Sequence, residues 1–355
     1  MANGNAVGAR GENHLHALRS GLATACGSLP HDDPDAATAL LLDAVPGLPA
    51  APSLPNRHVA EGMLGQGAWG MTGVAVDDRG HLVVDDPDAV GADEIGDGAD
   101  DLPAEAFGAT IAFLDTLAER AWKGPVKLQC TGPVTLGIGL VAAGLAPRRA
   151  FPVADLAARR RVRALVAATR RRLQRAPLVV VVDEPSLAAA TLGDAPVGVE
   201  EAVDLVSSTL AAVEADAVSG LHCCAPADWG AVLQAGPQLL SIPVDIAASV
   251  RAADLGPFLE RGGWVAWGVV PTGGPVGSVS GGGTGRLWRR LANRWHWLAD
   301  GGVDPVLLRR RALVTPACGL ARHDAEQAAL VLGLTAALGD RVAAGTLDEE
   351  RRAGG

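Results

Sequence analysis

Leu178-Val179-Val180-Val181-Val182-Asp183-Glu184 places five consecutive apolar residues before two carboxylates. A fully apolar run of this length is typical of a strand buried on both faces of a parallel sheet. The carboxylates then mark the end of the strand, where the chain leaves the core. The stretch predicts an α/β fold whose polar groups gather at the strand ends.

The rest of the chain repeats this strand-and-polar-end pattern. Strands are expected at 23–26, 126–130, 264–270 and in the apolar runs that end at His222, Asp245 and Pro316, with helices between them. Repeated strand–helix units with short connections predict a parallel sheet. A (β/α)8 TIM barrel gathers all of its strand ends around one mouth, whereas an open sheet gathers only a few. The number of polar strand ends therefore favours the barrel.

Charge and composition narrow the classes of partner. The chain has 355 residues and a formal net charge of −10, which argues against a nucleic-acid partner. Against this trend, a basic stretch runs from Arg159 to Arg175. It is interpreted either as the solvated face of a helix or as an anion or partner site.

The two ends and the cysteine content indicate a cytoplasmic protein without a membrane partner. Met1-Ala2-Asn3-Gly4-Asn5 lacks the pattern of a signal peptide, and no apolar run approaches the roughly 18 residues of a membrane span. Five cysteines, an odd number, do not indicate a disulfide framework. We expect flexible tails at 1–20 and 347–355 around one catalytic domain at 21–346.

Three predicted strand ends carry side chains that bind metals. His222 and Cys224 are two residues apart, so in an extended chain both side chains point the same way, while Cys223 points away. Cys318 and Asp245 follow two other strands. Together they predict a zinc site, because zinc takes about four nitrogen, sulfur or carboxylate ligands. Taken alone, the His-x-Cys pair favours a buried histidine beside a structural cysteine.

Two further strand ends offer groups for a polar ligand. Asp183 and Glu184 supply carboxylates for a substrate ammonium group, or the first of them caps a helix. The small residues Gly27 and Ser28 let backbone N–H groups approach a ligand closely, or form an ordinary turn. The Gly-rich segment Gly273–Gly285 is interpreted either as a lid over the barrel mouth or as a disordered connection.

Taken in order, these motifs resemble the catalytic C-terminal barrel of the cobalamin-independent methionine synthases. The resemblance spans residues 22–345 and rests on segments 26–30, 131–136, 183–187, 222–224, 241–245 and 315–320. It implies a (β/α)8 barrel enzyme, a methyltransferase of methionine biosynthesis that transfers a methyl group to the thiol of homocysteine with Zn2+ as cofactor.

The resemblance also implies roles for individual residues. Zinc is expected to bind His222, Cys224, Asp245 and Cys318. Homocysteine is expected to contact the Gly27-Ser28 and Asp183-Glu184 motifs, with Ser28 at its carboxylate and Asp183 at its ammonium group. Asp183 and Asp245 are the expected catalytic residues. Asp245 would give up its place on the metal when the substrate sulfur arrives.

The sequence departs from the family pattern in three places. Asp245 stands where the family usually has Glu, and 355 residues leave room for only one of the two barrels of the long enzymes. Gly137-Ile138-Gly139 replaces a tryptophan that the long enzymes associate with folate. The methyl donor is therefore either methyltetrahydrofolate or a methylated corrinoid protein.

Three other functions remain open from the sequence. One is a related zinc methyltransferase that acts on another small thiol of the coenzyme M type. Another is a barrel enzyme like uroporphyrinogen decarboxylase, which needs arginines at the mouth rather than zinc. The last is a metal-binding or regulatory protein without turnover.

Overall fold

A curved parallel sheet forms the centre of the protein. The computed structural model describes residues 14–96, 102–277 and 283–345. Six parallel strands lie side by side in chain order. They are β3 (Val126–Thr131), β4 (Leu178–Asp183), β5 (Val218–His222), β6 (Leu239–Pro243), β7 (Trp264–Val270) and β8 (Ala312–Pro316). The predicted parallel α/β architecture is confirmed for these strands.

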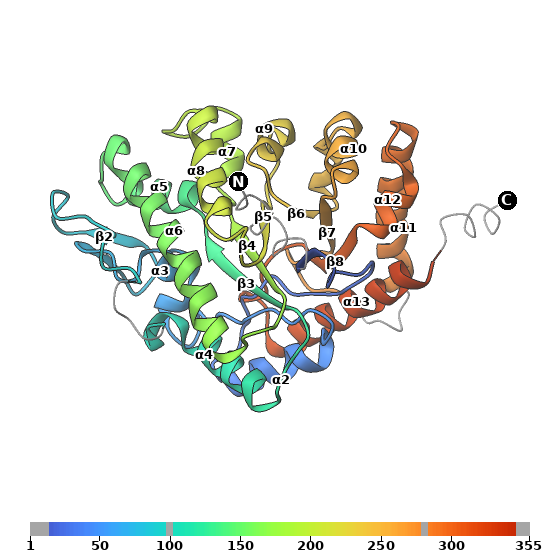
Figure 1. Ribbon diagram of the computed structural model, residues 1–355, viewed down its shortest axis with the longest axis horizontal. Helices are drawn as coiled ribbons and strands as arrows, with labels where there is room; N and C mark the ends of the chain where they lie inside the picture. Colours follow the sequence, from blue (N-terminus) through green and yellow to red (C-terminus); the bar gives the residue numbers. More distant parts are fainter. Residues whose placement is uncertain (1–13, 97–101, 278–282, 346–355) are drawn as a thin grey trace, which may run out of the picture.

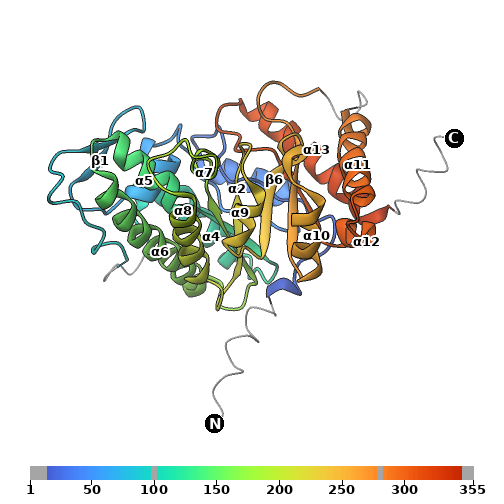
Figure 2. The same cartoon turned by 90° about the horizontal axis from the view of Figure 1, so that it is seen from above.

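Helices surround the strands on the outside (Figures 1 and 2). The longer ones are α2 (Pro34–Ala44), α4 (Ala104–Glu119), α5 (Pro133–Ala142), α6 (Pro147–Arg172), α8 (Val199–Ala211), α10 (Ala252–Glu260), α11 (Gly283–Asp300) and α13 (Ala325–Ala344). Shorter helices are α3 (Met63–Ala68), α7 (Leu187–Thr191), α9 (Trp229–Gln234), α12 (Pro305–Arg310) and the 3-10 turns η1 (Val59–Glu61) and η2 (Ile246–Ser249). No helix of the described residues is long and apolar enough to cross a membrane.

Local sequence signals account for most of the helix starts. Asp33 caps α2 by accepting a hydrogen bond from the Asp35 N–H, and Pro34 occupies the first turn. Asp324 caps α13 in the same way through the Gln327 N–H. Helix α6 begins at Pro147, because a proline suits the first turn of a helix.

Most of the basic stretch belongs to α6, and several of its arginines are bonded within the chain. Arg159 pairs with Asp155 one turn away, and Arg172 pairs with Asp115 of α4. Arg161 is buried, donates to the Trp69 carbonyl and stacks over the Phe107 ring. These contacts favour a structural role for the stretch over an anion or partner site.

Two extended segments join the edges of the sheet. The Thr24 N–H donates to the Val314 carbonyl of β8 at 2.9 Å, and the Ala51 N–H donates to the Lys127 carbonyl of β3 at 2.8 Å. A single bridge between Ser28 and Ser53 links the two segments. The strand expected at 23–26 is therefore a segment held by isolated bridges, and of the expected barrel six strands are regular.

Near the amino-terminal ends of the strands, apolar side chains fill the space inside the sheet. Val179 and Val181 of β4 point inward, where they pack with Leu18 and Trp264. Val180 belongs to the outer core between the sheet and the helices. Leu18 was expected to lie in a flexible tail, but it is only 5% exposed, because it closes the amino-terminal end of this inner core. The remaining expected tails, residues 1–13 and 347–355, lie outside the described residues.

A small antiparallel hairpin stands beside the sheet. Its strands, β1 (Val74–Val76) and β2 (Leu82–Val84), pair around the turn Asp77–Gly80. This is the hairpin that the turn residues Asp77-Asp78-Arg79-Gly80 indicate, because Asp and Gly favour tight turns between short apolar runs.

Helix α13 packs against the first extended segment through a contact between two glycines. A side chain on Gly339 would overlap the carbonyl oxygen of Gly21, which precedes the segment that bonds to β8. We expect Gly339→Ala to lower the free energy of unfolding by about 1–3 kcal/mol, the usual cost of overpacking. Urea denaturation followed by circular dichroism measures this change.

Gly333 of the same helix provides the matched control. A methyl group there meets no atom within 4 Å. Gly333→Ala should therefore stabilise the protein by roughly 0.5–1 kcal/mol through helix propensity alone. Equal effects at the two positions would contradict the proposed contact.

Candidate metal centre

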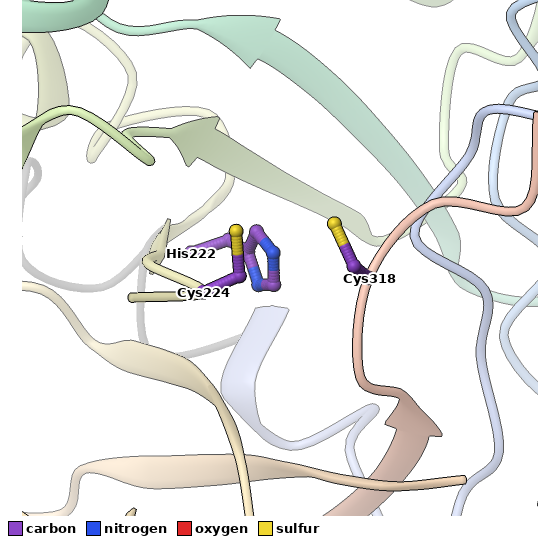
Figure 3. Close-up of side chains that lie close together, drawn as sticks. All are labelled: His222, Cys224 and Cys318. Carbon is purple, nitrogen blue, oxygen red and sulfur yellow. The ribbon is translucent and has the colours of Figure 1, made fainter. Parts of the chain in front are cut away.

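Three predicted metal ligands meet at the carboxyl ends of the strands. His222 is the last residue of β5, Cys224 follows it by two residues, and Cys318 follows the end of β8. One ligand atom of each residue lies within 4.8 Å of those of the other two. Figure 3 shows His222 and Cys224 side by side, with Cys318 facing them from the opposite loop. The geometry is that of a compact site for one ion.

Side-chain direction alternates along the extended chain after β5, and this places the two adjacent cysteines on opposite sides. Cys223 is 0% exposed, packs in the outer core, and its thiol donates to the Ala225 carbonyl at 3.6 Å. Cys224 is half-buried and lines the cavity inside the sheet. Neighbouring side chains of an extended segment point to opposite sides, so only one of the two thiols reaches the site.

Cys318 is positioned by contact with the first extended segment. The Leu320 N–H donates to the Ser28 carbonyl at 2.8 Å, and a side chain on Gly319 would overlap the Ser28 hydroxyl oxygen. The Cys318-Gly319 turn therefore lies directly on the Gly27-Ser28 turn. Two motifs from opposite ends of the chain form one rim.

The histidine presents one unoccupied nitrogen. Its Nδ1 lies 2.9 Å from the Ser241 hydroxyl, the register partner of His222 on β6. Its Nε2 is buried and forms no hydrogen bond with the described residues. Burying a polar atom without a partner is costly unless a ligand satisfies it. Metal-binding histidines are commonly held by a hydrogen bond to their other ring nitrogen, as Ser241 holds His222.

The two cavity thiols affect each other's acidity. The pKa of the Cys318 thiol lies well below its usual range, because it receives a hydrogen bond from the Cys224 thiol and faces His222. The same contact with Cys318, followed by burial, raises the pKa of Cys224. One of the two sulfurs is thus the preferred thiolate, which is the form that binds metals.

This donor set fits zinc. One imidazole nitrogen and two thiolates are ligands that suit zinc's tetrahedral shell. The buried Nε2 of His222, which has no hydrogen-bond partner among the described residues, is available to bind such an ion. Three protein ligands also leave one position open, as in catalytic zinc sites.

Asp245, the expected fourth ligand, is not brought to the other three. Its side chain is 63% exposed and forms an ion pair with Arg290 of α11. The strand β6 ends at Pro243, and Asp245 opens the following turn η2 outside the cavity. The expectation that Asp245 binds the metal and acts in catalysis has no support in this arrangement, because the carboxylate is turned toward the outer helix.

A cavity of about 610 Å³ adjoins the three ligands. Its lining includes Gly27, Ser28 and Asp183 of the predicted substrate motifs, together with the three metal ligands. Thr272 and Gly273 also border it, at the start of the Gly-rich segment, whose residues 278–282 lie outside the described part of the chain. The cavity is large enough for a small molecule beside a metal.

Asp183 points into this cavity from the end of β4. Its side chain accepts a hydrogen bond from the Gln129 amide at 2.9 Å. Burial raises the pKa of Asp183, whereas the neighbouring His222 and Lys127 act in the opposite direction. Residues Lys127 and Gln129 were not singled out from the sequence, because on a strand they look like ordinary polar positions.

Glu184 points the other way, into the helix layer. It is 0% exposed, and its carboxylate accepts hydrogen bonds from the Val134 and Thr135 N–H groups, both at 2.8 Å. The Thr135 hydroxyl donates to it at 2.6 Å. Burial raises the pKa of Glu184 to about 7, against the lowering effect of these bonds. The carboxylate therefore holds the start of α5 and is absent from the cavity lining, which corrects its expected role as a substrate contact.

Comparisons with known proteins address the fold. No family model matches the sequence, and a search of curated proteins finds no match. The fold resembles that of a B12-independent methionine synthase from Shewanella sp. W3-18-1 in complex with selenomethionine, with a TM-score of 0.55 at 14% identity. This alignment covers 94% of the present chain and 99% of the Shewanella chain. An endo-beta-1,4-mannanase double mutant from Cellulomonas fimi aligns with a TM-score of 0.48 at 13% identity, covering 98% and 77% of the two chains.

Substitution of the adjacent cysteines tests the metal centre. We expect Cys224→Ala to lose most of the bound zinc, because it removes one of three ligands. Cys223→Ala should keep stoichiometric zinc and only lower stability, because its thiol packs in the outer core. Metal analysis of the two purified variants measures the difference, and the reverse result would exclude the site.

A second substitution tests the position of Asp245. Because its carboxylate is paired with Arg290, Asp245→Ala should leave zinc affinity unchanged. Competition with a chromogenic chelator gives the affinity. A loss of tenfold or more, the effect typical of losing a supporting or direct ligand, would show that Asp245 reaches the metal.

Proposed function

We propose that this protein is a zinc-dependent methyltransferase that methylates the thiol of homocysteine to give methionine. The observation that carries the proposal is the meeting of His222, Cys224 and Cys318 at the edge of a cavity that Ser28 and Asp183 also line. A metal donor set and two groups suited to an amino acid thus border the same space.

The architecture in this proposal is a single (β/α)8 barrel formed by residues 21–346. The segments around Ala23 and Ala50 would take the first two strand positions, since they bond to β8 and β3 respectively. The likeness in fold to a methionine synthase, over nearly the full length of both chains, supports this proposal. That synthase was solved with selenomethionine, the selenium form of the proposed product.

The metal's part in the proposed chemistry is limited to the thiol. Bound zinc would favour the thiolate form of homocysteine, whose free thiol is largely protonated at neutral pH. In the transfer, the homocysteine sulfur forms a bond to the methyl carbon while the bond from that carbon to the donor breaks. The donor proposed is methyltetrahydrofolate or a methylated corrinoid protein.

The chain's own residues would orient the amino acid. Asp183 would accept hydrogen bonds from the ammonium group, and Ser28 would donate its hydroxyl proton to the carboxylate. Both side chains line the cavity beside the metal ligands. Holding the sulfur in line with the methyl group can supply about 7–11 kcal/mol of the barrier.

Zinc-edge X-ray absorption tests the acceptor directly. Zinc-loaded protein should gain one sulfur neighbour at the metal when homocysteine is added, because three protein ligands, His222, Cys224 and Cys318, would leave one position open. Methionine, which lacks a free thiol, is the control and should add none. An unchanged shell with homocysteine would contradict the proposed acceptor.

Turnover assays then show which of the two methyl donors the protein uses. Methyltetrahydrofolate and methylcobalamin should be offered in parallel to the zinc-loaded protein with homocysteine, and methionine formation measured. The Cys224→Ala variant, which lacks one candidate metal ligand, measures the background methionine formation that does not depend on the site.

A further inference from the structure

Lys127 is buried inside the sheet without a carboxylate in direct contact. It is 4% exposed, and its Nζ donates to the Ala25 carbonyl at 2.7 Å and to the Gln129 side-chain oxygen. No ion pair joins it to another described residue. Buried lysines are rare and costly, and burial lowers the pKa of this one. Such groups are more frequent at functional sites than elsewhere.

The lysine fixes the direction of the Gln129 amide. An ammonium group only donates hydrogen bonds, so the carbonyl oxygen of Gln129 must face Lys127. The amide nitrogen then faces Asp183 and donates to its Oδ2 at 2.9 Å. If the amide turned over, its oxygen would face the carboxylate and its nitrogen would face the ammonium group. Lys127 therefore keeps Gln129 as a donor toward Asp183.

This arrangement leaves one oxygen of Asp183 for a ligand. The Oδ2 atom is occupied by Gln129, and no described residue donates to Oδ1. The Asp183 side chain lines the cavity next to the metal ligands. A carboxylate held in one orientation, with one acceptor atom left, suits a ligand ammonium group.

The same amide also supports the other predicted substrate motif. Gly27 has a φ of +104°, and a side chain on it would come within 3.0 Å of the Gln129 amide. The Gly27-Ser28 turn therefore lies against the Gln129 side chain. Lys127 adds a second connection, because it binds the carbonyl of Ala25 just before this turn. One pair of side chains thus sets the positions of both motifs.

We propose that Lys127 and Gln129 are positioning residues that make the cavity selective for thiols carrying a primary ammonium group. This inference rests on the proposed function and names the residues through which the cavity would recognise the amino group of its thiol substrate. Lys127 orients Gln129, Gln129 orients Asp183, and Asp183 receives the ammonium group. Neither positioning residue takes part in the methyl transfer itself.

The test compares two thiols that differ only in the amino group. Calorimetric titration of zinc-loaded protein with L-homocysteine and with 4-mercaptobutyrate, its deamino analogue, gives both affinities. Gln129→Leu should weaken L-homocysteine binding by about tenfold to a hundredfold more than 4-mercaptobutyrate binding, the usual effect of losing a hydrogen bond to a charged group, because only L-homocysteine has the ammonium group that Asp183 would bind. Lys127→Met should act in the same direction, and Gln129→Leu decides alone if that variant does not fold.

Gln238→Leu is the matched control. Gln238 is also a partly buried glutamine, but its side chain accepts from the Ser219 N–H at 3.1 Å just before β6, at the opposite end of the sheet. This variant should bind both thiols as the unmodified protein does.

The outcomes separate the two proposals. Suppose that the unmodified protein binds L-homocysteine. If Gln129→Leu then lowers the affinity for both thiols equally, or changes neither affinity, the positioning role is overturned and the proposed function stands. If the unmodified zinc-loaded protein binds neither thiol, the proposed function fails and the inference fails with it.

Discussion

The contact between the Gly27-Ser28 turn and the Cys318-Gly319 turn is the constraint on which the rest of the site depends. It joins the first extended segment to the loop after the last strand, through the Leu320 N–H and through the missing side chain of Gly319. This contact lies where Cys318 comes within reach of His222 and Cys224. It also places Ser28 on the same cavity, so the candidate metal ligands and the proposed substrate contact Ser28 are positioned together.

The site stands on an apolar base. Val179, Val181 and Leu18 fill the inner space. Beside the two valines, Lys127 and Gln129 of β3 begin a chain of hydrogen bonds that reaches Asp183 at the cavity. Electrostatic interactions are stronger in such surroundings than in water, so each polar contact has a larger effect on orientation. The fold tolerates the cost of a buried lysine at the point where that orientation matters for the proposed function.

Adjacent side chains of an extended chain point to opposite faces, so neighbouring residues take different positions in the fold. Asp183 points into the cavity while Glu184 holds the start of α5. Cys224 joins the candidate metal site while Cys223 packs in the outer core. In each pair, one residue lines the cavity and the other supports the packing, because they face opposite sides of the sheet.

The sequence by itself determined the regular strands, several of the longer helices and the three candidate metal ligands that converge. These depend on local properties: the length of an apolar run, the capping residue that follows it, and the side to which alternate residues point. The tertiary structure alone decided that Asp245 turns to Arg290, that Glu184 serves a helix and that Lys127 and Gln129 lie beneath Asp183. It also decided that the chain near Ala23 and Ala50 forms single bridges rather than regular strands. The physical reason is that each of these outcomes depends on which segment, distant in the sequence, packs nearby. A local sequence pattern carries no information about such contacts.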